Sequence, residues 1–389
     1  MQKQIEVRAT YMRGGSSKGV FFETTDVPAD PARRDALLLR VIGSPDPYGK
    51  QTDGMGAATS STSKVVLVSR SARADCDVDY LFGQVDIEQP RIDWTGNCGN
   101  LTTAVGPFAI ARGLVDAPAD GVAVVRIWQA NIGKVIVAHV PMAGGTVQEL
   151  GDFVLDGVAF PAAQVRLEFL APGGDGSSAE ESLLPTGRVV DVLTVEGVGT
   201  FDVTYINAGN PTIFLRASDL GLTGKELQPD VNGDAALLAR IEAVRAAGAV
   251  AMGLATSAAQ ATASRPGTPK LAWVAPPADY VASSGKAVPA QALDLLVRIV
   301  SMGKLHHAIT GTGAVAVGAA AAVEGSIVAQ ALRPGAEGQD VRMGHTSGVL
   351  AVGAKAEHQS ERGWVIGQVS LSRSARRLME GVVLVPPVG

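Results

Sequence analysis

Two reactive side chains stand out in this sequence: a lysine behind a run of hydroxyl groups and a cysteine between glycines. The segment TDGMGAATSSTSK, residues 52–64, carries six Ser and Thr side chains and ends at Lys64. Hydroxyl groups donate hydrogen bonds to carboxylates without adding charge. A lysine acts as a general base only in its neutral form, which burial or a neighbouring cation such as Lys18 favours. The pattern predicts proton abstraction, whereas the alternative for Lys64 is an ordinary strand lysine that extends into solvent.

Two glycine motifs, GNCGN at residues 96–100 and TGTG at residues 310–313, each precede a predicted helix of small residues. Backbone N–H groups at a helix N-terminus lack helical partners, and the helix dipole attracts anions there. Two such termini in a pseudo-symmetric pair would hold two carboxylates of one small molecule. The alternative is that the glycines only permit tight turns and close helix packing.

Cys98 lies inside the first motif, where a helix N-terminus favours the thiolate form of a cysteine. The alternative is a small buried apolar residue, which is the usual role of a free cysteine. Cys76, within DCD on a predicted strand, has no such setting and is interpreted as structural. Arg13 is a further candidate, because a guanidinium can bind a carboxylate through two parallel hydrogen bonds.

Several classes of site are absent from the sequence. His306 and His307 are adjacent, so on a helix they would point about 100° apart, and His345 stands alone, which disfavours a metal site. The sequence has no dinucleotide-binding glycine motif in its strand–helix setting, no phosphate-binding loop and no nucleophile-elbow motif. We therefore expect neither a metal nor a cofactor.

Composition and charge narrow the class of protein further. The 389 residues include 33 basic and 38 acidic side chains, a net charge of −5, and 46% are hydrophobic. These values exclude a disordered chain and argue against a nucleic-acid-binding surface. The most apolar stretch, Ala308–Val323, is shorter than the roughly 20 residues of a membrane span, and the N-terminus lacks an apolar signal segment. We expect a cytoplasmic protein with no nucleic-acid or membrane partner.

The chain is longer than the roughly 250–300 residues that one core accommodates, which predicts two domains. A helix is expected at Ala32–Val41, ending at Gly43, and a flexible Gly- and Ser-rich loop at Pro172–Glu181. Alternating or β-branched patterns predict strands at Ile5–Thr10, Gly19–Phe22, Lys64–Ser69, Val78–Ile87, Val122–Trp128 and Lys134–Val140.

The second half of the sequence repeats three elements of the first half in the same order. Residues 11–22 (YMRGGSSKGVFF) have a loose counterpart at 206–215 (INAGNPTIFL), and 63–69 (SKVVLVS) at 269–277 (PKLAWVAPP). The GNCGN motif and its helix are matched by the TGTG motif and its helix. We interpret the chain as two duplicated halves that face each other. The alternative is coincidence among segments rich in Gly and Ala.

Six segments together closely resemble the 2-methylaconitate cis-trans isomerases of the PrpF family: YMRGGSSKGVFF, SPDPYGKQTDGMGAATSSTSK, DYLFGQV, GNCGNLTTAVGPFAI, SMGKLHHA and MGHTSG. The resemblance extends from Val7 to about Pro386. It implies the diaminopimelate-epimerase-like α+β fold, with two pseudo-symmetric domains that each wrap a β-barrel-like sheet around a central helix. Leu101–Gly113 and Ala314–Val323 would be these helices. The domains would span 1–187 and 188–389, with the return of the last element to the first domain left open.

The resemblance also implies a cofactor-independent isomerase that converts trans- to cis-2-methylaconitate in the 2-methylcitrate route of propionate breakdown. An aconitase-like 2-methylcitrate dehydratase would be its functional partner, and a homo-oligomer is left open. Epimerases of the wider fold use two cysteines; Cys98 matches the first, whereas Thr310 is too weak an acid to replace the second. In the family, the lysine that corresponds to Lys64 is implicated as the base instead, and Cys98 ranks below it.

By the same resemblance, polar groups on both sides would bind the carboxylates: Arg13, Ser16, Ser17, Lys18, Ser60, Ser61, Thr62, Ser63, Asn97, Gly99 and Asn100, with Thr310, Gly311 and Thr312 opposite. One alternative is a 4-oxalomesaconate tautomerase or another isomerase of unsaturated tricarboxylates with the same fold. A second alternative, from a different class, is a non-catalytic accessory protein of the dehydratase, which would need no base.

Overall fold

The structure, a computed structural model, describes residues 3–173 and 182–387. Most of the loop predicted at Pro172–Glu181 therefore lies outside the described residues. Contacts within the chain divide it into unit 1, Met1–Leu167 with Arg373–Gly389, and unit 2, Glu168–Ser372. The domain boundary expected between residues 187 and 188 stays a prediction.

Unit 1 consists mainly of strands around one long helix. Its elements are β1 (Ile5–Gly14), β2 (Ser17–Glu23), the 3-10 helix η1 (Thr24–Asp26), α1 (Pro31–Ile42), β3 (Lys64–Arg70), β4 (Val78–Val85), β5 (Ile92–Asp93), α2 (Gly99–Ala111), β6 (Gly121–Gln129), β7 (Lys134–Ala143) and β8 (Thr146–Val147). Two further strands, β9 (Gln164–Leu170) and β20 (Gly363–Val385), have residues in both units.

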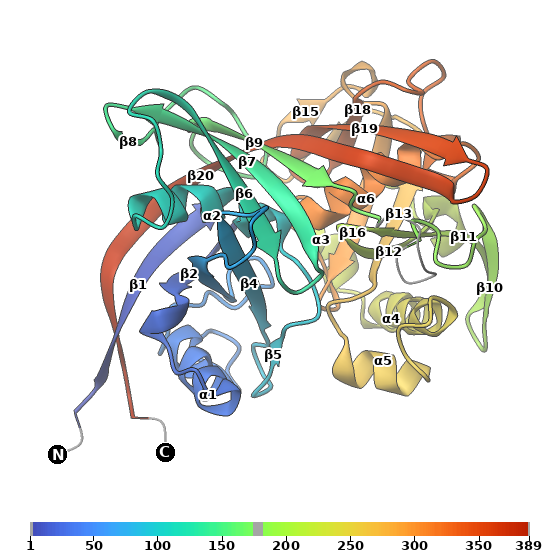
Figure 1. Ribbon diagram of the computed structural model, residues 1–389. Helices are drawn as coiled ribbons and strands as arrows, with labels where there is room; N and C mark the ends of the chain where they lie inside the picture. Colours follow the sequence, from blue (N-terminus) through green and yellow to red (C-terminus); the bar gives the residue numbers. More distant parts are fainter. Residues whose placement is uncertain (1–2, 174–181, 388–389) are drawn as a thin grey trace. The chain divides into compact units, whose positions relative to one another are not determined.

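The strands of unit 1 pair into a closed ring. β1 and β2 form an antiparallel hairpin, β2 pairs with β3 in parallel, and β3 pairs with β4 antiparallel. β4 runs parallel to β6, which forms an antiparallel hairpin with β7. The ring closes because β7 pairs with β9, β9 with β20, and β20 with β1, so the first and last strands of the chain are neighbours (Figure 1). The expected barrel-like sheet is confirmed.

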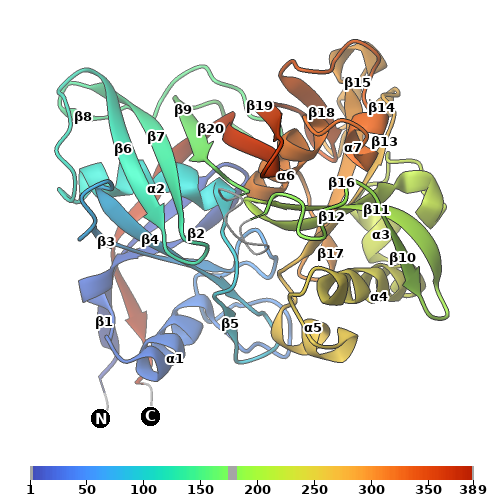
Figure 2. The ribbon, with the colours of Figure 1, turned by 45° about the vertical axis from the view of Figure 1, so that its right-hand side comes forward.

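Helix α2 is the centre of unit 1, where it runs behind β6 and β7 in Figure 2. All residues from Gly99 to Ala109 are buried, as expected for a helix that is apolar on every side. Small residues allow the strands to approach closely. A Cβ on Gly106 would lie 2.8 Å from the side chain of Val140, and one on Gly14 would lie 2.6 Å from the backbone oxygen of Asn100. The end of β1 therefore lies directly against the first turn of α2.

Unit 2 contains the same kinds of element. They are β10 (Asp191–Val195), β11 (Gly199–Ala208), β12 (Asn210–Arg216), η2 (Ala217–Leu220), α3 (Gln228–Asn232), α4 (Ala235–Ala251), α5 (Ala258–Ser264), β13 (Lys270–Ala275), β14 (Tyr280–Val281), β15 (Ala287–Val288), η3 (Ala290–Ala292), β16 (Leu295–Ser301), β17 (Lys304–Leu305), α6 (Gly311–Ala321), α7 (Ile327–Gln330), β18 (Val341–His345) and β19 (Gly348–Gln359).

The strand pairing of unit 2 repeats that of unit 1. β11 and β12 are antiparallel, β12 and β13 parallel, and β13 and β16 antiparallel. β16 and β18 are parallel, and β18 and β19 are antiparallel. This is the same succession as β1, β2, β3, β4, β6 and β7, and α6, buried along its whole length, corresponds to α2. β2 and β12 even share one burial pattern, residue for residue. The duplication inferred from the sequence is confirmed in the topology.

Local sequence signals agree with the ends of the predicted elements. Helix α1 begins after Asp30, whose side chain accepts a hydrogen bond from the backbone of Arg33, and it ends at Gly43, whose φ of 83° suits glycine. One expectation was wrong: Cys76 does not lie on a strand but in the loop before β4. It is buried, and burial raises the pKa of its thiol, in agreement with the structural role expected for it.

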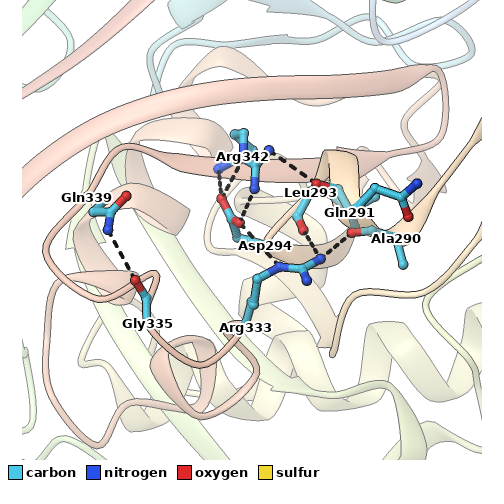
Figure 3. A network of polar contacts seen from close by, with 8 residues as sticks. All are labelled: Ala290, Gln291, Leu293, Asp294, Arg333, Gly335, Gln339 and Arg342. Atoms are coloured by element: carbon cyan, nitrogen blue, oxygen red, sulfur yellow. Dashed lines mark hydrogen bonds and ion pairs between the residues drawn. The ribbon is translucent and has the colours of Figure 1, made fainter.

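A buried carboxylate, Asp294, holds the start of β16 in unit 2 (Figure 3). Its Oδ1 accepts from Nη2 of Arg342 at 2.7 Å, and its Oδ2 accepts from Nε and the backbone N–H of Arg342 at 3.1 and 2.9 Å. Nε of Arg333 lies 3.8 Å from the same carboxylate. Burial raises the pKa of Asp294, but the hydrogen bonds and charge of Arg342, with Arg333, outweigh it and hold the pKa below its ordinary value.

Asp294→Asn is expected to lower the free energy of unfolding near pH 7 by about 1.5–3 kcal/mol, the range for hydrogen bonds to a charged group. A carboxylate with a lowered folded-state pKa stabilises the fold fully above its unfolded pKa of about 4. This contribution is lost as the pH falls through the folded pKa. The difference between wild type and variant, measured by urea unfolding, should therefore shrink on acidification from about pH 6 to about pH 3.

Asp202→Asn is a matched control in the same unit, because Asp202 pairs with Arg216 at 3.2 Å while both side chains are more than a third exposed. An exposed pair contributes at most about 1 kcal/mol. Equal losses in the two variants would contradict the role assigned to Asp294.

Candidate active site

Lys64 and Cys98, predicted from separate motifs, are in direct contact. Lys64 is the first residue of β3, and the register of β3 with β4 places it opposite Gln84. Its Nζ donates to Oε1 of Gln84 at 3.0 Å and lies 3.4 Å from Sγ of Cys98. Lys64 and Cys98 are each only 7% exposed. A basic nitrogen and a thiol therefore share a hydrogen bond in a setting with little water.

Cys98 is the N-cap of α2, and its backbone is held from several sides. Its Sγ accepts from the backbone N–H of Leu101 at 3.5 Å. Its carbonyl oxygen accepts from the hydroxyl of Tyr80 at 3.3 Å and from Oγ1 of Thr102 at 3.0 Å. Burial, and next the charge of Cys98, raise the pKa of Tyr80 well above its usual value, so this phenol stays a neutral donor. The thiol is thus fixed at the helix N-terminus, as the sequence predicted.

The contact between Lys64 and Cys98 gives the site two ways to hold one proton. The pair can hold this proton as ammonium with thiolate or as amine with thiol. The ring of Phe82 lies 4.9 Å from Nζ. The amine form keeps N–H donors for Gln84. The pair is therefore able to remove a proton from a bound molecule and to return it.

The loop between β1 and β2 lies beside the first turn of α2. Nδ2 of Asn100 donates to Oγ of Ser16 at 3.1 Å and to Oγ of Ser17 at 3.4 Å. Gly15, with φ 51°, is needed here, because a Cβ would lie 2.4 Å from Oδ1 of Asn100. The backbone N–H of Lys18 donates to the carbonyl of Ser61 at 3.0 Å. The structure thus brings the GGSSKG loop, the hydroxyl-rich segment and the helix N-terminus together in unit 1.

Other hydroxyl groups of residues 59–63 have partners within their own segment or close to it. Oγ of Ser63, fully buried, donates to Oε1 of Gln51 at 2.7 Å, and Oγ1 of Thr62 lies 2.8 Å from Oγ1 of Thr59. Ser60 is half-buried and Ser61 is buried. Carboxylate binding by these four predicted residues stays a prediction, and Ser63 would first have to leave Gln51.

Arg13 was also predicted to bind a carboxylate. In the structure, one of its guanidinium nitrogens donates to backbone carbonyl groups. Its Nη1 donates to the carbonyl oxygens of Gly15 at 3.0 Å and Ser374 at 2.8 Å. Burial and the neighbouring Arg376 lower the pKa of Arg13 to about 10, so it remains a cation at neutral pH. Arg13 therefore links the loop after β1 to Ser374 of β20.

The second glycine motif caps α6 in unit 2. Oγ1 of Thr310 accepts from the backbone N–H of Gly313 at 3.0 Å, and Oγ1 of Thr312 accepts from Nδ2 of Asn210 at 3.1 Å. Gly311 is the first, buried residue of the helix. Lys270 corresponds to Lys64 but donates to the carbonyl of Gly267 at 3.0 Å and to Oγ of Ser301 at 3.2 Å. The lysine–thiol pair of unit 1 thus has no equivalent at these positions of unit 2.

Two residues that contact Lys64 or Cys98 were not predicted from the sequence: Gln84 and Tyr80. They lie on the same face of β4, four residues apart, both within the motif DYLFGQV. Their alternation along a strand was the available signal. Arg373 is fully buried in β20, and no local pattern connects it with Cys98.

Among the described residues, no cluster of His, Cys, Asp or Glu has the arrangement of a metal site. The described helices include none with the length and apolar character needed to cross a membrane.

Comparison with known proteins assigns the chain to a family. The family described as PrpF protein matches residues 4–386. A 2-methyl-aconitate isomerase of Shewanella oneidensis is 60% identical over 98% of both chains, and one of Cupriavidus necator is 59% identical over the same shares. A 4-oxalomesaconate tautomerase of Pseudomonas putida is 39% identical, over 98% of this chain and 97% of its own.

Solved structures agree with this assignment. A methylitaconate-delta-isomerase, 37% identical, matches with a TM-score of 0.76 over 99% of this chain and 96% of its own. A hydroxyproline epimerase from Agrobacterium vitis, 12% identical, matches with a TM-score of 0.54 over 97% of this chain and 92% of its own, which shows the fold alone. The expected epimerase-like α+β fold is confirmed. With its family match over nearly the whole chain and relatives of about 60% identity, the chain belongs to the PrpF family.

Proposed function

We propose that this protein is an isomerase that converts trans-2-methylaconitate to cis-2-methylaconitate without a cofactor. The observation that carries the proposal is the 3.4 Å contact between Nζ of Lys64 and Sγ of Cys98 at the N-terminus of α2. It provides a buried proton acceptor next to backbone N–H groups that favour an anion. The two relatives of about 60% identity, both named 2-methyl-aconitate isomerase, support the choice of substrate.

The chemistry follows from the structure of the substrate. Rotation about a carbon–carbon double bond breaks the π bond and is therefore extremely slow at ambient temperature. The bond must first lose its double-bond character. The amine of Lys64 removes a proton from the CH₂ group next to the double bond, and the electron pair of that C–H bond spreads through the double bond into a carboxylate. The former double bond now rotates as a single bond. The ammonium then returns the proton to the same carbon, and the double bond re-forms in the cis arrangement.

The surrounding groups stabilise the charge of this dienolate. Donors that are fixed before the reaction stabilise developing negative charge better than mobile water does. The side chains of Ser16, Ser17 and Asn100 and the first N–H groups of α2 are such donors in unit 1. Carboxylate binding by Thr310 and Thr312, at the N-terminus of α6 in unit 2, stays a prediction. Cys98 either passes the proton to Lys64 or lines the site, and it ranks second as a catalytic group.

A 4-oxalomesaconate tautomerase is the alternative function, because it too would move an allylic proton on an unsaturated tricarboxylate. The relative with that name is 39% identical, against 60% for the first 2-methyl-aconitate isomerase. An accessory protein without catalysis would need no buried lysine in contact with a thiol. We also infer that an aconitase-like dehydratase supplies the substrate, since dehydration of 2-methylcitrate yields an unsaturated tricarboxylate of this kind.

The proposed function is tested by incubating the purified protein alone with trans-2-methylaconitate, cis-2-methylaconitate and 4-oxalomesaconate, each followed by proton NMR. We expect interconversion of the first two substrates and much slower reaction of the third. Faster reaction of 4-oxalomesaconate would establish the alternative. No reaction with any of the three would favour the accessory protein.

Asn97→Asp tests anion binding at α2. Asn97 is 3% exposed, directly precedes Cys98, and accepts from Oγ1 of Thr102 at 3.4 Å, a bond that aspartate retains. The new carboxylate repels those of the substrate, so KM should rise on the order of tenfold or more. The fold should not be destabilised, because an acidic residue near a helix N-terminus is favourable.

The uncharged variant Asn97→Ser is the control for loss of the amide. Its KM should rise clearly less than that of Asn97→Asp, as measured by initial rates over a range of substrate concentrations. Equal KM values for wild type and Asn97→Asp would show that no carboxylate binds at this terminus.

A further inference from the structure

Arg373 is a buried cation without a hydrogen-bond partner in the part of the chain that the structure describes. Its side chain is fully buried in β20, and Nε, Nη1 and Nη2 all lack a partner among the described residues. Other buried arginines differ: Arg245, 2% exposed, forms an ion pair with Glu242 at 2.7 Å and donates to the carbonyl of Arg265. The guanidinium of Arg373 therefore has donors that the protein itself does not use.

Arg373 lies beside the reactive end of α2. The backbone N–H of Gly15 donates to the carbonyl of the next residue, Ser374, at 2.9 Å, and Nη1 of Arg13 donates to the same carbonyl. Gly15 in turn lies directly against Asn100, in the first turn of α2. A negative charge on Cys98 opposes the effect of burial on the pKa of Arg373.

The charge of Arg373 persists at neutral pH. Burial lowers the pKa of Arg373 to about 10, with Cys98 acting in the opposite direction, and a pKa of 10 still leaves the guanidinium protonated. An isolated charge transferred from water to a protein interior is strongly unfavourable unless a counter-charge and hydrogen bonds compensate for it. A carboxylate satisfies both needs, because it matches the two parallel donors of a guanidinium.

We propose that Arg373 binds a carboxylate of the substrate beside Cys98 and stabilises the dienolate formed when Lys64 removes the allylic proton. The inference rests on the proposed function for the identity of the substrate, but it concerns a site residue that the sequence did not indicate.

The role of Arg373 in the reaction follows from the movement of charge. As Lys64 takes the proton, the electron pair of the broken C–H bond passes into the carboxylate at the far end of the double bond. That carboxylate then carries more negative charge than in the ground state. A fixed guanidinium binds it more tightly at that moment, which lowers the barrier as well as improving binding. Loss of Arg373 should therefore lower kcat and raise KM.

The central test compares wild type with Arg373→Met, which keeps much of the volume and removes the charge. The ligand is propane-1,2,3-tricarboxylate, a saturated tricarboxylate that cannot isomerise, and its Kd is measured by calorimetry. We expect Kd to rise on the order of 10- to 100-fold, the usual range for a lost charge-assisted pair. The free variant should have a Tm equal to or above that of wild type, because an uncompensated buried charge has been removed.

Arg245→Met is the matched control, because Arg245 is equally buried but already paired within unit 2. Its loss leaves Glu242 without a partner, so Tm should fall while Kd for the tricarboxylate stays the same. The opposite pattern for Arg373→Met, a lower Tm with an unchanged Kd, would show that Arg373 is a structural residue and would overturn the proposal.

A ligand with one carboxylate fewer provides an independent measurement. Succinate should bind wild type more weakly than the tricarboxylate does, and this preference should shrink in Arg373→Met. A preference that stays the same would also overturn the proposal. Should Arg373→Met fail to fold, Arg373→Lys keeps the positive charge without the paired donors, and we expect its Kd to rise several-fold with kcat reduced. Wild-type values for Arg373→Lys would count against carboxylate binding.

These binding measurements need no turnover. A protein that binds the tricarboxylate through Arg373 but does not isomerise 2-methylaconitate would disprove the proposed function and leave this inference intact. Normal isomerisation by Arg373→Met would disprove this inference and leave the proposed function intact.

Discussion

Lys64→Ala is expected to lower kcat/KM for trans-2-methylaconitate by about 10²- to 10⁴-fold, the contribution of a positioned general base. Lys64 is the only basic nitrogen that the described structure shows bonded to Cys98, at 3.4 Å from Sγ, and it is almost fully buried. Alanine leaves no group at this position able to take the allylic proton. The loss should appear mainly in kcat, because the base acts in the transition state, and initial rates over a range of substrate concentrations separate kcat from KM.

Lys270→Ala is the matched control for this variant. Lys270 also begins a buried strand and is also 7% exposed, but its partners are Ser301 and the backbone of Gly267. Its loss should reduce thermal stability and leave kcat within a few-fold of wild type. Loss of activity in Lys270→Ala together with normal turnover in Lys64→Ala would show that the base has been assigned to the wrong unit.

The second large effect is expected in D₂O. A dienolate intermediate allows the ammonium of Lys64 to exchange with solvent before it returns the proton. Product and recovered substrate should then carry deuterium at the CH₂ group next to the double bond, detected by NMR and mass spectrometry. Substrate deuterated at that carbon should also react more slowly when proton removal limits the rate.

A competing mechanism makes this experiment informative. The thiolate of Cys98 would add to the double bond, the new single bond would rotate, and the thiolate would leave again, so that no allylic C–H bond breaks. That route requires a nucleophilic sulfur and should be abolished in Cys98→Ala. Under the lysine mechanism, Cys98→Ser should instead lose clearly less activity than Lys64→Ala, because a hydroxyl keeps a hydrogen bond to Nζ.

If the ammonium of Lys64 is shielded from solvent, it returns the proton that it has just removed, and no deuterium enters. Missing deuterium is therefore decisive only together with other results. The lysine mechanism is refuted when three results occur together: no deuterium enters, no isotope effect appears while chemistry limits turnover, and Cys98→Ala is inactive.

Sequence patterns alone predicted the main elements and the reactive side chains. The signal for the end of α1 is local: the helix was expected to end at Gly43, and it does. The motifs GNCGN and TGTG indicated two helix N-termini, and α2 and α6 begin at these motifs. At Gly313 a Cβ would lie 2.4 Å from Cδ1 of Ile299, which explains the small residue there. The repeat of three segments in the same order indicated the duplicated topology, because equal patterns of buried positions form equal strands.

The contacts between these residues depend on how the elements pack. Lys64 and Cys98 lie on different elements, and only the packing of α2 inside the ring of strands brings them to 3.4 Å. Gln84 became the partner of Lys64 through the register of β3 with β4, which a single sequence does not reveal. Ser63, just before β3, donates its hydroxyl to Gln51, a contact between two loop positions that the sequence pattern does not indicate. β20, from the far end of the chain, lies beside the end of β1, because strand pairing joins residues regardless of their separation in sequence.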